Sequence, residues 1–386
     1  MSIAANEPGE MTAPATVEHT SPDERIQSID ALRGFDMLWI SGGGEFLHTL
    51  AVATSWTWAI AVAGQFEHSR WVGCTFYDLI QPLFLFICGI TLPLSIGRRM
   101  RRGQTRMQIL RRLALRAVVL VILGQLDKNG PVSFDVAHIR FAGILQRIGV
   151  AGLAAGAIMM YARPRAQILW VIGILGGYGA LMTFVPAPGQ PAPSFEPGVN
   201  IVDYLDQHVM PGRLDAGTHD AEGWFSTPPA VASVLFGALA GAWLLSAASV
   251  QRKVMGLLGA GAVLVALGLL WGLHLPIIKN LFTSSYVVYT AGLSCLLLGL
   301  FYGVIDGLRL RAWAFPLLLI GMNPLLIYIL RSTGWVDFRY IAKFFFGFGF
   351  AHASAPVAAL CHVVATITVE LLFLYWLYRR KLFWRI

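Results

Sequence analysis

The sequence has few charged residues for its length. Of its 386 residues only 13% are Asp, Glu, Lys or Arg, whereas 56% are hydrophobic, and soluble domains carry roughly 25% charged residues. A soluble protein of this length would need more polar surface than these residues supply. The hydrophobic residues also occur in long blocks, and roughly 20 apolar residues are enough to cross a bilayer core of about 30 Å. A water-soluble globular fold is therefore excluded.

Metal-binding and disulfide motifs are missing as well. Three of the four cysteines, Cys88, Cys295 and Cys361, lie in hydrophobic blocks, and Cys74 lies alone before one. A cysteine in such a block behaves as a small hydrophobic residue. Because no C-x-x-C or Cys/His spacing is present, we expect no disulfide framework and no metal cofactor.

The first 25 residues lack the apolar segment of a signal peptide. They are rich in Ala, Pro, Glu, Ser and Thr, a composition that cannot bury a core. We predict that residues 1–25 form a disordered cytoplasmic tail and that residues 26–386 form one transmembrane domain.

The hydrophobic blocks predict an all-α, polytopic transmembrane bundle of about ten helices. The expected spans are 31–54, 75–97, 109–126, 139–161, 166–186, 230–248, 254–273, 284–305, 312–331 and 356–378. A further block, 342–351, is rich in Phe and Gly and is too short to cross the membrane. We expect it to be interfacial or re-entrant.

The basic residues predict the topology. The net charge is +8, and seven arginines lie between Arg98 and Arg112, directly after an apolar block, where positive charge holds a loop in the cytoplasm. This placement argues against a nucleic-acid partner. With ten spans and both termini cytoplasmic, twenty of the 29 Lys and Arg residues lie inside: Arg25, Arg33, the eight from Arg98 to Arg116, Arg163, Arg165, Arg252, Lys253, Arg309, Arg311, Arg379, Arg380, Lys381 and Arg385. We expect a multi-pass protein of a bacterial inner membrane.

Two segments then lie outside the membrane. One contains His68 and joins the first two spans, and the other is the long loop 187–229, which is rich in Asp, Glu and His. Long ordered loops are often functional. An imidazole such as that of His68 can accept a proton from an amine or carry a transferred group. The alternative is an ordinary interfacial histidine beside aromatic residues.

Polar residues interrupt several spans. They are Asp36, Glu45, Asp78, Arg140, Gln146, Arg147, Asn323 and Glu370. Such residues are costly inside a membrane, and they are retained either for function or for pairing within the bundle.

Three consecutive glycines, 42–44, predict a break in the first helix, and Glu45 would then face the cavity that the break lines. The cytoplasmic arginines have two interpretations, because they suit both phosphate binding and topology.

Seven motifs occur together and in a fixed order. They are 28–37 (SIDALRGFDM), 67–73 (EHSRWVG), 75–87 (TFYDLIQPLFLFI), 143–148 (GILQRI), 220–223 (DAEG), 276–281 (PIIKNL) and 321–324 (GMNP). In this combination the sequence resembles the heparan-α-glucosaminide N-acetyltransferase family of transmembrane acyltransferases, and is most similar to its bacterial, NagX-like branch. The resemblance runs from about Ser28 to the C-terminus.

The resemblance implies an enzyme that takes acetyl groups from cytoplasmic acetyl-CoA and acetylates glucosamine or a glucosaminide on the periplasmic side. It implies that His68 is catalytic, as a base or as an acetylated intermediate, with Glu67 or Asp78 orienting the imidazole. It also implies a homodimer in contact with membrane lipid. The remaining candidates are Glu45, Asp220, Glu222, Lys279 and Asn280 for the acceptor or the oxyanion, and Arg33, Arg98, Arg99, Arg147 and Asn323 for acetyl-CoA.

Two other functions stay open at the level of sequence. A transporter of amino sugars or acyl groups would also have about ten helices and intramembrane charges. An acyltransferase could use another acyl donor or another acceptor, such as a cell-wall muropeptide.

Overall fold

A computed structural model describes residues 26–130, 135–350 and 352–384. The predictions for residues 1–25 and for Arg385 lie outside the described residues. Within the described residues every regular element is helical, and the only bridges between extended segments are isolated ones, between 72–73 and Ile278 and between Arg140 and Gly212. The predicted all-α class is confirmed.

The helical elements follow one another along the chain, and the longest connections lie on either side of α8. The first half contains α1 (Gln27–Leu38), η1 (Trp39–Gly43), α2 (Gly44–Thr54), α3 (Thr57–Gly64), η2 (Tyr77–Leu79), α4 (Ile80–Arg101), α5 (Arg106–Asn129), α6 (Ile144–Tyr161) and α7 (Pro164–Phe184). The second half contains α8 (Ile201–Val209), α9 (Thr227–Leu244), α10 (Val250–Gly272), α11 (Ser284–Phe301), η3 (Tyr302–Gly307), η4 (Ala312–Ala314), α12 (Phe315–Met322), α13 (Pro324–Thr333), α14 (Phe338–Phe346), η5 (Gly347–Phe350) and α15 (Ala355–Arg379).

Within the described part of the chain, seven helices are long and apolar enough to cross a membrane, or eight if the pair α12–α13, bent by 62°, is one broken span. The two other expected spans, 31–54 and 109–126, are also helical, as α1–η1–α2 and α5, but they carry more charge. All ten expected ranges therefore fall on helices. The fourth begins later than expected, at Ile144, because Arg140 pairs with acidic residues of a loop.

Burial distinguishes a central helix from peripheral ones. In the most apolar window of α4, 72% of the residues are buried, whereas the corresponding value for α10 is 17%. Apolar side chains exposed along a 23-residue helix suit contact with lipid. The central pair α4–α9 crosses at glycines: a Cβ on Gly89 would lie 2.0 Å from the Val234 oxygen, and one on Gly237 would lie 1.9 Å from the Phe86 oxygen. Only glycine permits this close approach.

The first membrane helix is broken, as the glycine run predicted. Between α1 and α2 the backbone leaves the helical region at Ser41 and at Gly42, where φ is 115°. Residues other than glycine rarely adopt this conformation. The Gly42 backbone lies close to the Arg331 side chain of α13 and to Ile367 of α15. The break therefore packs against the last part of the chain.

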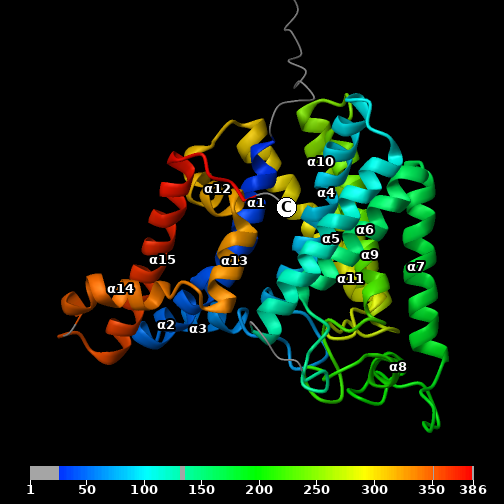
Figure 1. Cartoon of the computed structure of the whole chain (residues 1–386), viewed down its shortest axis with the longest axis horizontal. Helices are drawn as coiled ribbons and strands as arrows, with labels where there is room; N and C mark the ends of the chain where they lie inside the picture. Colours follow the sequence, from blue (N-terminus) through cyan, green and yellow to red (C-terminus); the bar gives the residue numbers. More distant parts are fainter. Residues whose placement is uncertain (1–25, 131–134, 351, 385–386) are drawn as a thin grey trace, which may run out of the picture.

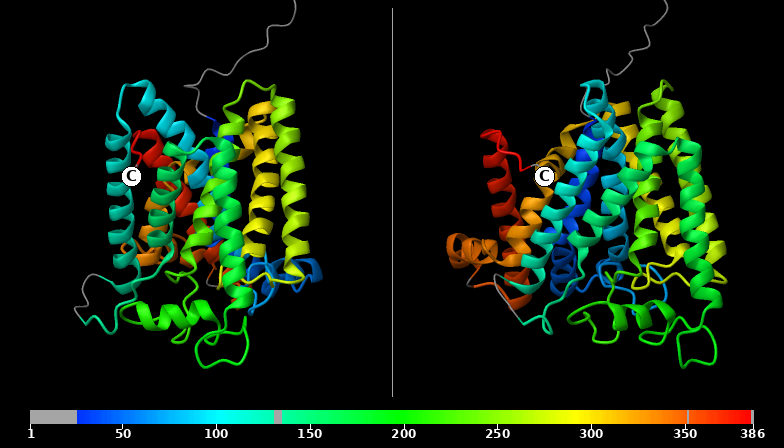
Figure 2. Two further views of the ribbon diagram at one scale, coloured as in Figure 1. Left: turned by 90° about the vertical axis from the view of Figure 1, so that its right-hand side faces the viewer. Right: turned by 45° about the vertical axis from the view of Figure 1, so that its right-hand side comes forward.

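The helix ends and loops gather at two ends of the bundle (Figures 1 and 2). We call the end that carries α8 the outer end. It also holds α2, α3, α14 and the connections 65–76, 135–143 and 273–283, and α14 lies across the direction of the spanning helices. The start of α1, the end of α15 and the arginine-rich turn after α4 lie together at the other end, which we call the basic end. The two ends of the described chain thus lie on one side.

Candidate active site

The segment that holds His68 is anchored to a loop more than 200 residues later. Val72 and Gly73 form backbone bridges with Ile278, and the Gly73 N–H donates to the Ile277 oxygen at 2.8 Å. The Gly73 φ of 113° is accessible mainly to glycine. Ile278 is fully buried. The two segments are therefore held side by side at the outer end.

Asp78 orients the His68 ring. Its fully buried carboxylate accepts a hydrogen bond from His68 Nδ1 at 2.8 Å. The second oxygen of the carboxylate accepts from the backbone N–H groups of Ser69 and Thr75 and from the Thr75 hydroxyl, each at 3.1 Å. Four donors therefore hold the carboxylate in place. A proton on Nδ1 leaves the lone pair on Nε2, which is the form that can act as a base or nucleophile.

Lys279 completes a cluster around the imidazole. Its Nζ lies 2.9 Å from His68 Nδ1, 3.3 Å from His68 Nε2 and 3.5 Å from Asp78 Oδ1. Burial lowers the pKa of Lys279, and the negative charges of Asp78 and Glu222 oppose this shift. The Tyr77 ring packs against the imidazole, with the two ring centres 4.7 Å apart.

Cys74 is close to this cluster but is a poor nucleophile. Burial and the charge of Asp78 raise the pKa of its thiol to about 12. Because the thiolate is the reactive form of cysteine, the thiol remains protonated and unreactive near neutral pH. His68 and Lys279 are then the nucleophilic side chains of the cluster.

A second cluster surrounds Arg140 and joins the outer loop to the bundle. Arg140 donates to both carboxylate oxygens of Asp220, at 2.8 and 2.7 Å, and to Glu222 at 2.6 Å, and it also pairs with Asp215. Although burial opposes ionisation of Asp220, Arg140 holds the pKa of that carboxyl below its usual value. Glu222 in turn lies 3.5 Å from the Gln81 amide nitrogen on α4. The bidentate pair of Arg140 with Asp220 fixes the outer loop to the bundle.

Arg147 lies at the outer end and not with the arginines of the basic end. It is buried at the start of α6, where it donates to the Gly223 oxygen at 3.2 Å and to the Ser226 hydroxyl. Its guanidinium also lies 4.9 Å from the centre of the Phe282 ring. Two of its nitrogens, Nε and Nη1, have no hydrogen-bond partner among the described residues.

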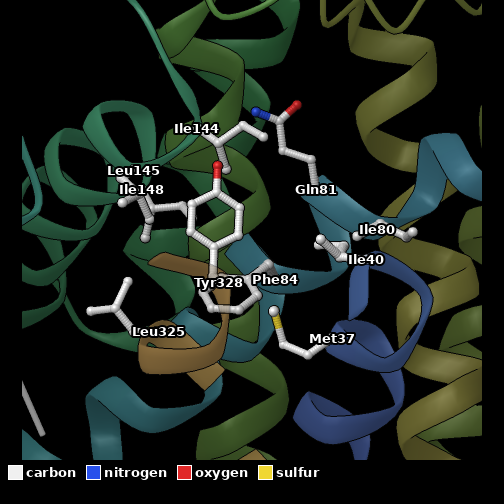
Figure 3. A pocket seen from close by; sticks show the side chains of 10 residues that line it. All are labelled: Met37, Ile40, Ile80, Gln81, Phe84, Ile144, Leu145, Ile148, Leu325 and Tyr328. Carbon is white, nitrogen blue, oxygen red and sulfur yellow. The ribbon is translucent and has the colours of Figure 1, made fainter. Parts of the chain in front are cut away.

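An apolar cavity lies beside these clusters, inside the bundle (Figure 3). It is small, with a volume of about 40 Å³, and lies between α1, η1, α4, α6 and α13. Ile80 and Gln81, which begin α4 two and three residues after Asp78, form part of its wall. Gln81 Oε1 is buried and has no hydrogen-bond partner among the described residues. The other lining residues are Met37, Ile40, Phe84, Ile144, Leu145, Ile148, Leu325 and Tyr328.

Four of the residues predicted to bind acetyl-CoA are at or toward the basic end. Arg33 on α1 donates to Asp30 at 3.2 Å and to the Gly321 oxygen at 3.5 Å. Asn323 joins α12 and α13 and bonds the backbone of Leu382 and Trp384. Arg98 and Arg99 belong to the last turn of α4. The last turn of α4, which carries Arg98 and Arg99, thus lies at the opposite end of the bundle from the connection 65–76, which holds His68 (Figure 1).

Three further candidates lie toward the outer end, and among the described residues no hydrogen bond joins them to the imidazole. Glu67 is mostly exposed, and its carboxylate lies 3.9 Å from His48 Nε2. Glu45 pairs with Arg339 at 2.7 Å and lies 3.9 Å from Arg331. Asn280 follows Lys279 on the same loop. No group of three or more His, Cys, Asp or Glu side chains in the described ranges is placed to hold a metal ion.

Sequence reasoning did not select Tyr286, Gln81 or Tyr328 as site residues. The Tyr286 hydroxyl donates to the Asp78 backbone oxygen at 2.6 Å, and the Tyr328 hydroxyl donates to Asp127 at 3.1 Å. Both tyrosines lie in apolar helices, where a tyrosine is an ordinary core residue. In the sequence these three residues stand out only because each has a polar side-chain atom, which would lack a hydrogen-bond partner in a membrane interior.

Comparison with known proteins shows the family of the chain. Residues 25–268 match the catalytic region of the heparan-alpha-glucosaminide N-acetyltransferase family. Heparan-alpha-glucosaminide N-acetyltransferase from Homo sapiens is 25% identical over 97% of this chain and 62% of its own length. The protein of the same name from Mus musculus is 24% identical over 95% of this chain and 61% of its own length. The chain thus spans about three-fifths of these relatives, and it belongs to the heparan-α-glucosaminide N-acetyltransferase family.

Proposed function

We propose that this chain is a transmembrane N-acetyltransferase that moves an acetyl group from cytoplasmic acetyl-CoA to the amine of glucosamine or a glucosaminide on the periplasmic side of a bacterial inner membrane. The observation that carries the proposal is the cluster of His68, Asp78 and Lys279 at the outer end, next to an apolar cavity that reaches into the bundle. The family supplies the reaction, and the cluster supplies a base and a cation for it.

The small apolar cavity marks one place on the path that the pantetheine arm of acetyl-CoA would take through the bundle, and it would have to widen to admit the arm. Its walls are mostly aliphatic and aromatic, and Gln81 offers a buried oxygen without a partner among the described residues, which an amide N–H of the arm would satisfy. In this proposal Arg33, Arg98, Arg99 and Asn323 hold the phosphate-bearing part at the basic end.

The outer-end residues would perform the chemistry. Acetyl-CoA supplies a thioester, whose carbonyl carbon an amine attacks. His68 Nε2 takes the proton of the acceptor amine while Asp78 holds Nδ1 and stabilises the imidazolium. Lys279 supplies positive charge beside the oxygen on which negative charge develops. Asp220 and Glu222, held by Arg140, bind acceptor hydroxyl groups.

The deciding experiment measures free thiol. Purified protein is incubated with acetyl-CoA and a panel of amino sugars, and thiol release is followed with and without each sugar. We expect release that depends on a glucosamine amine and disappears in His68→Ala. An active His68→Ala protein would refute the central assignment.

The route of transfer has its own test. If the acetyl group passes through His68, label from radioactive acetyl-CoA stays on the protein when no sugar is present, in a form that neutral hydroxylamine removes. Direct transfer predicts no such labile label under trapping conditions.

A transporter is the second candidate, because the breaks at Gly42 and at Asn323 are features that transport proteins also use. It predicts sugar flux into liposomes without consumption of acetyl-CoA. Thiol release with a muropeptide and not with glucosamine would instead indicate another acceptor. The homodimer stays a prediction that the mass of the detergent-solubilised protein tests.

A further inference from the structure

Lys279 occupies the position that an acceptor amine needs. Its Nζ lies within 3.3 Å of both ring nitrogens of His68. A nitrogen at such distances from both cannot lie in the plane of the ring, because the Cε1–H group stands between them in that plane. The amine of Lys279 therefore lies over the face of the imidazole. An amine that attacks an acyl group approaches from the same direction, perpendicular to the plane of the carbonyl.

The Lys279 side chain is also suited to react there. It is 14% exposed, and the buried Asp78 carboxylate lies 3.5 Å from its nitrogen. Burial lowers the pKa of Lys279, which increases the share of neutral amine. The backbone pairing of Ile277 and Ile278 with Gly73 fixes the loop on which Lys279 stands. Proximity to a base and a fixed backbone are the two conditions for fast intramolecular acyl transfer.

We propose that Lys279 is a self-acetylation site, at which the enzyme modifies its own amine when acetyl donor is present and acceptor sugar is absent. The inference rests on the proposed function, since it needs an acetyl thioester delivered to His68. The neutral Nζ forms a C–N bond to the acetyl carbon, and the C–S bond of the thioester breaks. Once the flexible Lys279 side chain moves toward the ring plane, where the Nε2 lone pair lies, His68 takes the proton lost by Nζ and passes it to the leaving thiolate, which departs as the thiol. If the acetyl group is first on His68, the bond to the ring nitrogen breaks instead, and that nitrogen accepts the proton.

The product is an amide and is therefore stable. It removes the positive charge beside His68 and places an acetamide where the acceptor amine must bind. The enzyme thus loses activity during exposure to donor alone, and acceptor sugar protects it by consuming the acetyl group.

The test uses the full chain in detergent or nanodiscs with isotopically labelled acetyl-CoA and no sugar. Peptide mass spectrometry measures acetylation of each lysine after hydroxylamine treatment, which removes acetyl groups from histidine and cysteine but not from lysine. Lys128 and Lys343 are internal controls, because the end of α5 and α14, which carry them, also lie at the outer end (Figure 1), and neither lysine forms a hydrogen bond or ion pair with a histidine among the described residues. General base catalysis predicts that Lys279 is acetylated roughly 100-fold faster than either.

Two comparisons make the result decisive. His68→Asn, which keeps a polar side chain, should reduce acetylation of Lys279 to the level of Lys128. In the wild type, glucosamine should slow the modification of Lys279, a measurement that needs no variant to fold. Equal acetylation of Lys279 and Lys128 would overturn the inference, as would modification unchanged in His68→Asn. Thiol release with glucosamine and an unmodified Lys279 refutes this inference alone, whereas absence of both refutes the proposed function as well.

Discussion

The Asp78→Asn substitution tests the central geometry most directly. One oxygen of Asp78 accepts three hydrogen bonds, from Ser69 and Thr75, and the other faces His68 Nδ1. An asparagine can keep the three donors only by placing its oxygen toward them. Its NH₂ group then faces Nδ1 and donates to it. The imidazole proton moves to Nε2, so the base is lost although the shape of the site is kept.

The structure sets the size of the expected effect. Loss of one charge-assisted hydrogen bond alone would cost about 1.5–3 kcal/mol, or roughly 10- to 100-fold in rate. Reversal of the tautomer also removes the Nε2 lone pair, and in hydrolytic triads the same change lowers kcat about 10⁴-fold. Because three donors force the orientation of the amide, we expect the larger value, with KM nearly unchanged.

The assay is thiol release at saturating acetyl-CoA and sugar, with thermal stability measured alongside. Asp203→Asn is the matched control, because Asp203 is another buried carboxylate of the outer end and bonds Gly198 and Asn200 instead of His68. It should leave kcat near the wild-type value. A loss of less than about tenfold in Asp78→Asn, in a folded protein, would refute the role of Asp78 in setting the tautomer.

Three further predictions concern the scaffold around the site. Gly42→Ala should destabilise the protein by about 1–3 kcal/mol, because the φ of Gly42 is 115° and a Cβ there would lie 3.1 Å from Arg331. Gly44→Ala should be tolerated, because the nearest neighbours of a Cβ there lie at 3.6 Å. Equal melting temperatures for the two variants would contradict this prediction. Arg140→Lys should raise KM for the sugar more than it lowers kcat, because a lysine cannot make the bidentate pair that fixes Asp220. A change in kcat alone would show that the loop does not hold the acceptor. Burial raises the pKa of Asp203 and of Asp206 to about 6, so the folded loop favours their protonated forms. The stabilisation is complete below about pH 4 and is lost as the pH rises through 6; the loop should therefore resist proteolysis better at pH 5 than at pH 7.5, and resistance that rises with pH would disprove the assignment.

Much of the fold follows from local patterns in the sequence. Each apolar block became a helix, because a membrane interior requires backbone hydrogen bonds to be satisfied within the segment. The glycines at 42–44 predicted the break in the first helix, since only glycine adopts the backbone conformation of Gly42 without strain. The start of the fourth span was less predictable, because the pairing of Arg140 with a distant loop overrides the hydrophobic pattern.

The sequence by itself therefore determined the class of protein, the positions of its long apolar helices and the segment that holds His68. Tertiary structure alone decided which charged groups meet. Lys279 lies 211 residues from His68 and Asp220 lies 80 residues from Arg140, and no periodicity or spacing relates such positions. The Ile278 backbone pairing and the packing of buried helices bring them together. It was also the tertiary structure that placed Lys279 over the His68 ring, the contact on which the proposed self-acetylation rests.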